Sequence, residues 1–295
     1  MLRPFFSLLF IYCWLLAPAQ QHSVGLGIHT GFTIPVTVDK GMDTDPRYDS
    51  RYSVKGAPFG IALMKDWEGF GVVLTPGLIT IGQNYDVVNT EGGHDGMRKI
   101  TLQYVTLPIG FKLHLIDLDF FRVSALASVG ANYLLDASDY ITHENTKLKF
   151  PSEALPILPE NYVSQYDGVL VPDIDKQTIS VKEDYSNLQL LAGLGLRSDW
   201  DISNHWRVSF DVRVNYVFFD PRQDAYLERI KTYQSLYDTP GARTDLYMSL
   251  NVGIARFIEF DKNDKEREKN LKGSKKRYVP SKQYNTRRRT SPRNR

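Results

Sequence analysis

The feature that most constrains this chain is a two-residue alternation of apolar and polar side chains, repeated in eight stretches. In residues 206–218, Phe210 and Val214 fall on one face, whereas Arg207 and Asp211 fall on the other. Because successive side chains of a β-strand point to opposite faces, this stretch has one apolar side and one charged side. Eight such stretches predict an all-β fold: an eight-stranded antiparallel transmembrane up-and-down β-barrel, with lipid outside and a polar lumen inside.

The N-terminus predicts export. Arg3 precedes an apolar run, Phe5 to Leu16, and Ala17-Pro18-Ala19 follows as a small-residue cleavage site, so residues 1–19 are predicted to be a signal peptide. The run is shorter than the roughly 20 residues of a spanning helix, which argues against an uncleaved anchor. The only cysteine, Cys13, lies within the signal, so the mature chain is expected to hold no disulfide and no thiolate site.

The connections between the stretches fall into two sets. The strands are predicted at residues 22–35, 54–64, 70–83 (interrupted by Pro76), 98–115, 120–135, 187–200, 206–218 and 244–260. Tight turns are predicted at 65–69, 116–119 and 201–205, and long loops at 36–53, 84–97, 136–186 and 219–243. Outer-membrane barrels have short periplasmic turns and longer extracellular loops, so a barrel over residues 20–260 is expected to keep both termini in the periplasm.

A secreted β-sandwich is the alternative fold, because it also contains many alternating strands. Sandwich strands average about five or six residues, whereas the strands predicted here run to about a dozen. The regular alternation of short turns and long loops along the chain is a further property that a sandwich does not predict. The barrel is therefore favoured.

Several stretches resemble the PorT-type outer-membrane β-barrel family: GIHTGF, PFGIALMKDWEGFGVVLTPGLITIGQ, LQYVTLPIGFKLHL, VSALASVGANYLL, LLAGLGLRSDW and VSFDVRVNYVFFD. The most diagnostic part is the fourth strand, with Tyr104, Pro108 and Lys112. The similarity covers about residues 22–260. It implies an outer-membrane barrel and an association with type IX protein secretion. The long loop 136–186 and a basic C-terminal extension depart from the family pattern.

The lumen is predicted to be filled rather than open, because an eight-stranded barrel is only wide enough for its own side chains. Charged residues occupy inward positions, and we interpret them as a salt-bridged polar plug: Lys112, Arg122, Arg197, Asp199, Arg207, Asp211, Arg213 and Glu259. In this set, five cations face three anions. A small anion that uses the excess positive charge is the alternative.

Catalytic chemistry finds little support in the sequence. Of six histidines, only His94 and His143 are predicted on the extracellular side, near Glu91, Asp95 and Glu144. Neither has a nucleophile at strand-fixed spacing, and no two histidines have the spacing of metal ligands. We therefore expect no catalytic residue, no cofactor and no metal site.

Two segments outside the strands are candidates for binding. The loop 136–186 contains Pro156, Pro159, Tyr162 and Tyr166 among other apolar side chains, which favours a partner-binding or self-capping loop over an unstructured one.

The tail 261–295 holds 14 Lys or Arg and 4 Asp or Glu, a net charge of +10, against a net charge of −8 for residues 1–260. Such asymmetry indicates an interaction tail, although a solvated extension is the alternative. The expected partners are periplasmic and anionic (lipid head groups, cell-wall polymer or an acidic protein) and not nucleic acid. The side chains expected to bind are Lys275, Lys276, Arg277, Tyr278, Arg287, Arg288 and Arg289.

These observations predict an integral outer-membrane barrel that contacts lipid and protein partners and acts as a non-catalytic structural or assembly component of an envelope complex. Type IX secretion is the context that the family resemblance implies. A transport barrel for small solutes or hydrophobic ligands is the main alternative, and a lipid-modifying enzyme is a further one.

Overall fold

The computed structural model of the chain describes residues 22–118, 120–203 and 205–260. The predicted signal peptide (1–19) and the predicted tail (261–295), with all seven of its proposed binding side chains, lie outside the described residues. The chain divides into two units, residues 1–259 and 260–295, and the fold described here is that of the first.

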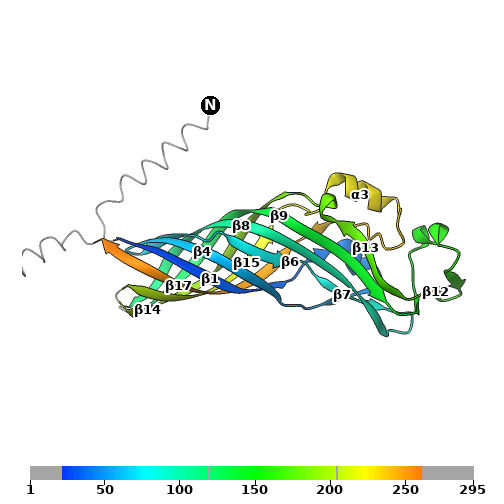
Figure 1. Ribbon diagram of the computed structural model, residues 1–295, viewed down its shortest axis with the longest axis horizontal. Coiled ribbons are helices and arrows are strands. Elements are labelled where there is room, and N and C mark those ends of the chain that lie inside the picture. The colour runs from blue at the N-terminus through cyan, green and yellow to red at the C-terminus, as the bar shows by residue number, and fades with distance from the viewer. Residues whose placement is uncertain (1–21, 119, 204, 261–295) are drawn as a thin grey trace, which may run out of the picture. The chain divides into compact units, whose positions relative to one another are not determined.

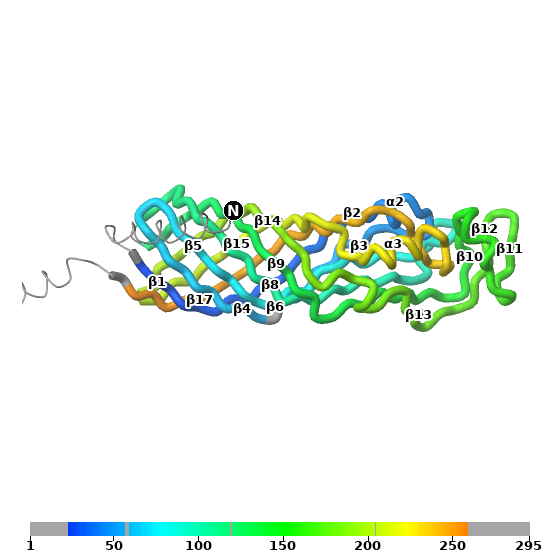
Figure 2. The backbone as a smooth tube through the Cα atoms, turned by 90° about the horizontal axis from the view of Figure 1, so that it is seen from above, coloured from blue at the N-terminus to red at the C-terminus, as the bar shows by residue number. Residues whose placement is uncertain are grey.

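Eight strand positions close into one curled sheet (Figures 1 and 2). The ladders β1–β4, β8–β9, β9–β14, β14–β15 and β15–β17 are antiparallel, and β17 neighbours β1. This confirms the predicted barrel. The wall consists of β1 (His22–Pro35), β4 (Lys55–Trp67), β5 (Phe70–Leu74) with β6 (Gly77–Ile81), β8 (His94–Leu118), β9 (Phe121–His143), β14 (Leu188–Ser203), β15 (Trp206–Val217) and β17 (Leu246–Phe260).

The third strand position is divided between β5 and β6, as the proline in its middle predicts. Pro76 has no N–H to donate to a ladder. Its carbonyl nevertheless accepts a hydrogen bond from the Ile61 N–H at 2.8 Å, and the Thr75 N–H donates to the Pro108 carbonyl at 3.2 Å. The wall therefore stays hydrogen-bonded on both sides of the break.

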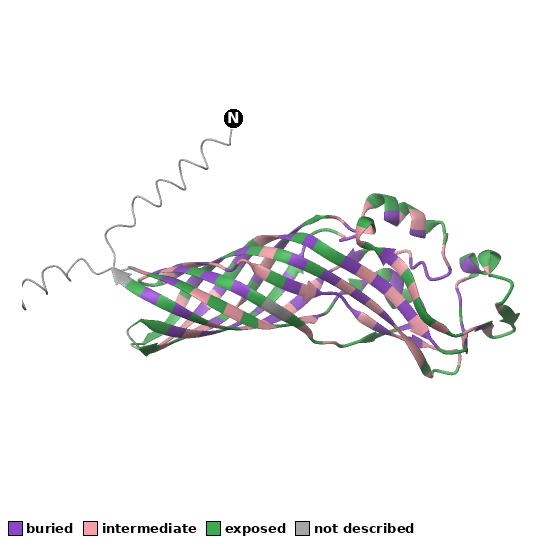
Figure 3. Ribbon diagram, in the orientation of Figure 1, coloured by how far each residue is buried: buried purple, intermediate pink, exposed green. Residues whose placement is uncertain are grey.

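The alternation of burial follows the alternation of the sequence, as the striped ribbons of Figure 3 show. On β15, Arg207 and Asp211 are buried in the lumen, whereas Phe210 and Val212 are about half exposed on the outside. Exposed apolar side chains continue around all eight positions: Leu26, Ile28, Ile61, Leu63, Leu78, Leu107, Ile109, Phe111, Val129, Leu194, Leu196, Val214, Val252 and Ile254. A continuous outer apolar band of this kind suits contact with lipid.

Every long connection lies at one end of the barrel and is built from short elements. The first holds β2 (Val38–Asp39), α2 (Lys40–Thr44) and β3 (Tyr48–Arg51), and the second holds β7 (Asn84–Val88). The third holds β10 (Thr146–Leu148), η2 (Ser152–Ile157), β11 (Val163–Gln165), β12 (Gly168–Val171), β13 (Ile174–Val181) and η3 (Lys182–Asp184). The fourth holds α3 (Asp224–Lys231) and β16 (Arg243–Thr244). We call residues 36–54, 82–104, 136–187 and 218–245 the head.

Among the described residues, no helix is long and apolar enough to cross a membrane.

The strands β8 and β9 continue into the head, which corrects the predicted strand ends at Arg98 and Leu135. β8 begins at His94 and β9 ends at His143, so residues 136–143 are strand, and β13 returns from the third connection to pair with them. A β-bulge at this level shifts the phase of β9, because Gln103 pairs with Asp136 while the next residue pairs with Leu134. The alternation changes phase there, and the predicted strand therefore stopped too early.

The polarity of the wall also reverses at this level. On β8, the inward residues Ile100 and Leu102 are apolar and buried, and the outward Gln103 is exposed. Nearer the end of the barrel with the short connections, the inward Lys112 of the same strand is charged, and the outward Phe111 is apolar and half exposed. The change from an apolar to a polar outer face marks where the wall leaves the apolar band.

The turn after β4 is shorter than predicted. β4 continues to Trp67, so only Glu68 and Gly69 separate it from β5, and Gly69 has a left-handed φ of +84°. The additional strand residues bring Asp66 onto the inward face. Asp66 is thereby placed in the lumen, where it contacts three cationic side chains.

Candidate functional site

One carboxylate organises the lumen at the end where the connections are short. Asp66 lies 2.6 Å from the ammonium of Lys112, 2.7 Å from the guanidinium of Arg207 and 3.4 Å from that of Arg122. These groups come from β4, β8, β15 and β9, and Asp66 and Lys112 are almost fully buried. Four strands of the wall are therefore joined through a single side chain.

A chain of ion pairs continues from this centre along the lumen. Lys112 also contacts Asp199 at 3.3 Å, and Asp199 accepts a hydrogen bond from Arg197 at 2.9 Å. Arg197 lies 3.7 Å from Asp211, which accepts the Arg213 Nε–H at 2.7 Å. We call the connected set the lumen network: Asp66, Lys112, Asp117, Arg122, Arg197, Asp199, Asp201, Arg207, Asp211 and Arg213.

The structure brings seven of the eight predicted lumen residues into this network. The side chain of the eighth, Glu259, lies outside the described part of the chain. Sequence reasoning missed Asp66, Asp117 and Asp201 because it placed all three in turns. Their inclusion gives five carboxylates for five cations, so the excess positive charge that an anion could use is not found among the described pairs.

The space left beside the network is small. A cavity of about 60 Å³ is lined by His29, Met64, Arg197, Arg213 and Tyr247 among others. Since one water molecule needs roughly 10–15 Å³ by this measure, the cavity has room for about four to six waters. Apolar side chains fill the adjoining level, where Arg207 lies 4.1 Å from the centre of the Phe257 ring.

The opposite end of the barrel is filled by an apolar and aromatic core. Buried side chains of the head pack with those of the adjoining parts of the wall strands: Met42, Tyr48, Ile81, Tyr85, Val87, Ile100, Leu102, Tyr104, Leu134, Ile141, Leu148, Phe150, Val169, Val171, Tyr185, Leu236 and Tyr237. The long connections therefore fold over and into the barrel mouth.

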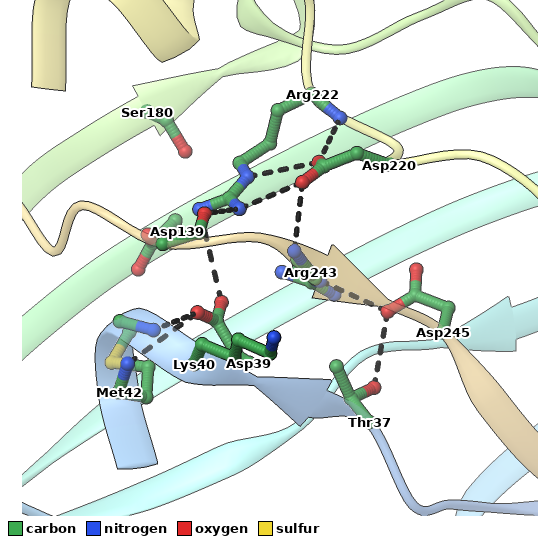
Figure 4. A network of polar contacts seen from close by, with 12 residues as sticks. Thr37, Asp39, Lys40, Met42, Asp139, Ser180, Asp220, Arg222, Arg243 and Asp245 are labelled. Carbon is green, nitrogen blue, oxygen red and sulfur yellow. Dashed lines mark hydrogen bonds and ion pairs between the residues drawn. The ribbon is translucent and has the colours of Figure 1, made fainter. Parts of the chain in front are cut away.

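A second set of ion pairs holds the first connection to the fourth (Figure 4). Arg222 donates to Asp220 at 2.8 Å and lies 3.9 Å from Asp39, while the Arg243 backbone N–H donates to Asp220 at 2.8 Å. The Arg243 guanidinium donates to Asp245 at 2.9 Å. We call this set the collar: Thr37, Asp39, Asp220, Arg222, Arg243 and Asp245.

The collar also sets the local backbone and the protonation of its acids. Asp39 caps α2 by accepting the backbone N–H groups of Gly41 and Met42. Burial raises the pKa of Asp39, against the opposing charges of Arg222 and Arg243. Burial also acts to raise the pKa of Asp220, but the hydrogen bonds and charge of Arg222 hold that pKa below its usual range.

Two further buried arginines hold the middle of the head. Arg98 binds Asp139 through two hydrogen bonds of 3.0 and 2.6 Å and donates to the Tyr237 carbonyl at 2.8 Å. Arg47 binds Asp45 at 2.6 Å and donates to the Leu236 carbonyl at 2.7 Å. Because two-point Arg–carboxylate pairs have a fixed geometry, they orient the connections as well as neutralise charge.

The predicted loop residues separate into two groups. Tyr162 packs against the head core, and its hydroxyl lies 3.3 Å from that of Tyr237. Pro156 within η2, Pro159 after it and Tyr166 between β11 and β12 are exposed. The third connection therefore caps the barrel, while part of its outer surface stays accessible.

The two predicted extracellular histidines lie in different surroundings. His143 is buried and hydrogen-bonded to the Tyr237 hydroxyl at 2.7 Å and to the Glu144 carbonyl at 2.9 Å. His94 is about half exposed, 3.3 Å from Asp86. Within the described ranges, no group of three or more His, Cys, Asp or Glu residues is placed to hold a metal ion.

The fold, the apolar band and the filled lumen define an integral β-barrel of the outer-membrane class. No family model matches the chain, and no curated protein matches it. Similar solved structures include the attachment invasion locus protein Ail of Yersinia pestis (10% identity, 81% of this chain, 99% of that chain, TM-score 0.29). The outer membrane protease OmpT of Escherichia coli (9%, 82%, 98%, 0.34) and the outer membrane protein OprG of Pseudomonas aeruginosa (12%, 81%, 96%, 0.29) are similar as well.

Proposed function

We propose that this chain is an outer-membrane barrel, closed to solutes, that acts as a non-catalytic structural or assembly component of an envelope complex. The observation that carries the proposal is the filling of both ends of the lumen. Ten charged side chains occupy one end in mutual ion pairs, and the aromatic core of the head occupies the other. The cavity of about 60 Å³ between them is too small for most solutes.

The same proposal orients the barrel. Short connections join β4 to β5, β8 to β9 and β14 to β15, whereas every long connection lies in the head. Since outer-membrane barrels place long loops outside the cell, the head is proposed to be extracellular and both termini periplasmic. The tail 261–295 would then be a periplasmic docking arm for an anionic partner.

The sequence supports a proposal for the kind of envelope complex to which the chain belongs. The resemblance to the PorT-type family makes type IX protein secretion the leading context. The net charge of +10 in residues 261–295 supports an acidic docking partner, such as a periplasmic protein or cell-wall polymer.

Conductance tests whether the barrel is closed. The purified full chain, inserted into planar bilayers, should give no stable current steps, and liposomes that carry it should not swell in small sugars. A general porin in the same lipid serves as the positive control. Stable steps from the inserted full chain would contradict closure and support the transport alternative.

Co-purification tests the assembly role. Partners crosslinked to the full chain in outer membranes should be lost when residues 261–295 are deleted, while heat-modifiable migration of the barrel persists. Replacement of Arg287, Arg288 and Arg289 by Gln should lose part of the same partners. Retention should fall with added salt, because exposed charges are screened over about 8 Å at physiological ionic strength. Equal recovery after deletion would leave the tail without a docking role.

A further inference from the structure

A pocket of about 390 Å³ opens on the head where three of its four connections meet. Its walls include Pro46 from the first connection, Pro151 from the third, and Tyr233 and Pro240 from the fourth. The volume lies within the roughly 300–1,000 Å³ of small-molecule pockets. None of its lining residues belongs to the lumen network or the collar, so neither of these ion-pair sets accounts for the pocket.

An aromatic ring lines this pocket from a backbone position that favours glycine. Tyr233 follows Thr232, the C-cap of α3, and has a φ of +49°. Helices often end with a left-handed residue at this position, and glycine is usual because it has no Cβ. Bulky residues held at positive φ are strained, and such strain gathers at ligand sites. Helix termination alone therefore does not explain a tyrosine here; the side chain also packs against the head core, which fixes it beside the pocket.

An ion pair at the pocket wall links the connections that form it. Asp45 lines it and is bound by Arg47, which also reaches the Leu236 carbonyl and lies 4.5 Å from the centre of the Phe150 ring. One buried guanidinium thus joins the same three connections that form the walls. A preformed site of this kind loses little entropy when a ligand binds.

The polar groups of the walls carry no net charge. Asp45 is neutralised by Arg47, and the two remaining charged groups, Lys149 and Glu153, have opposite signs. Lys149 donates no hydrogen bond within the described part of the chain, and Glu153 accepts one from the Ser152 hydroxyl at 3.0 Å. The pocket therefore combines an aromatic residue and prolines with polar side chains such as Lys149 and Glu153, and it has no excess charge for an ionic ligand.

We propose that this pocket binds a pyranose ring of a neutral glycan, stacked on Tyr233. A pyranose has one face of C–H groups and a rim of hydroxyls. The Tyr233 ring and the prolines suit the C–H face, the Lys149 ammonium can donate to a ring or hydroxyl oxygen, and the Glu153 carboxylate can accept from a hydroxyl. The site is additional to the proposed closed barrel and does not depend on it.

Saturation-transfer NMR on the full chain tests the proposal, in amine-oxide micelles because glycoside detergents would compete. Two probes separate the sources of the sugar: N,N′-diacetylchitobiose stands for a free saccharide, and long-chain lipopolysaccharide for a membrane glycan. Transfer to either probe that depends on Tyr233 supports the pocket and identifies the source. Absence of transfer to both probes, or displacement of the sugar by inorganic phosphate, would overturn it.

Matched variants separate binding from folding. Tyr233→Gly removes the ring and suits the positive φ, which offsets part of the packing that the ring makes with the head core, so the protein should stay folded while sugar binding weakens about tenfold. Tyr166→Ala, at the fully exposed tyrosine between β11 and β12, should leave binding unchanged. Lys149→Met and Glu153→Met should each weaken binding about threefold or more by removing one hydrogen-bonding group. Wild-type affinity in Tyr233→Gly would overturn the proposal.

Discussion

The half of the barrel at the short connections, which we call the lower half, carries charged side chains at inward positions of β8 and β14: Lys112, Arg197 and Asp199. In the head, inward positions of β8 carry Ile100 and Leu102. The outer face changes in the opposite sense, from Phe111 in the apolar band to Gln103 above it. The head follows the ordinary rule of a protein in water, with an apolar inside. The lower half reverses that rule because its outer solvent is lipid, and its charges are stabilised by one another in the lumen.

The two halves also differ in how their ion pairs are made. Lumen pairs join side chains of the regular strands, either on neighbouring strands, as in Arg197–Asp211, or across the lumen, as in Asp66–Arg207, so their positions follow from the sheet. In the head, Arg222 reaches Asp39, Arg47 reaches the Leu236 carbonyl and Arg98 reaches the Tyr237 carbonyl. These contacts join segments that are distant in sequence, so their geometry depends on how the loops fold. The lumen pairs therefore brace the wall, whereas the head pairs hold loops in place.

The largest expected effect is at the centre of the lumen network. Asp66→Ala leaves Lys112, Arg122 and Arg207 without a shared carboxylate in a buried space. We expect it to lower the free energy of unfolding by about 5 kcal/mol, because breaking a buried pair costs about 3–5 kcal/mol and more than one pair is lost. Urea unfolding in lipid vesicles measures this. Asp117→Ala, at a partly exposed partner of Arg122, should cost less than about 1 kcal/mol.

The corresponding change in the head should act locally. Arg98→Met leaves the buried Asp139 carboxylate without its two-point partner and should cost about 3–4 kcal/mol. Hydrogen exchange should rise in β10 to β13 and not in β14 or β15, because the pair holds the head and not the lower wall. Arg51→Met, at an exposed pair with Asp86, is the matched control. Equal loss of protection in both halves would mean that the two regions unfold as one unit.

Charges placed on the outer face should distinguish the halves directly. Val212→Arg places a cation within the apolar band of β15 and should destabilise the barrel by about 2–4 kcal/mol. Gln103→Arg, on the outer face at the level of the head, should change stability by less than about 0.5 kcal/mol. Folding yield and urea midpoint in vesicles measure both. A similar cost at the two sites would contradict the assigned boundary of the band.

The smallest expected effect is a pH dependence confined to the head. Burial lowers the pKa of His143, beyond the apolar band, below its usual value of 6.5. A lowered folded pKa means that the unfolded chain binds more protons, so the stabilisation is complete above pH 6.5 and is lost as the pH falls towards the folded pKa. Protease cleavage within residues 144–173 should accelerate on acidification. His143→Gln should remove that dependence, and an unchanged pH profile in this variant would exclude His143 as its origin.

The sequence by itself was sufficient for the membrane part of the fold. Phe210, Val212 and Val214 against Arg207 and Asp211 make β15 predictable, because a strand in a barrel wall meets lipid on one face and the lumen on the other. The same reasoning located the inward cations. Their full set of partners was missed, since Asp66 lies where the sequence resembles a turn and the structure continues the strand.

The head was decided by tertiary structure. Its strands keep a two-residue period, but the bulge at Leu135 and Asp136 shifts the phase and the polarity of the two faces reverses, so the membrane pattern no longer applies. The pairs Arg47–Asp45 and Arg98–Asp139 look like ordinary surface charges in the sequence, and only the folded loops bury them. Local periodicity records which solvent faces a strand, whereas loop packing depends on contacts between distant residues that no local pattern encodes.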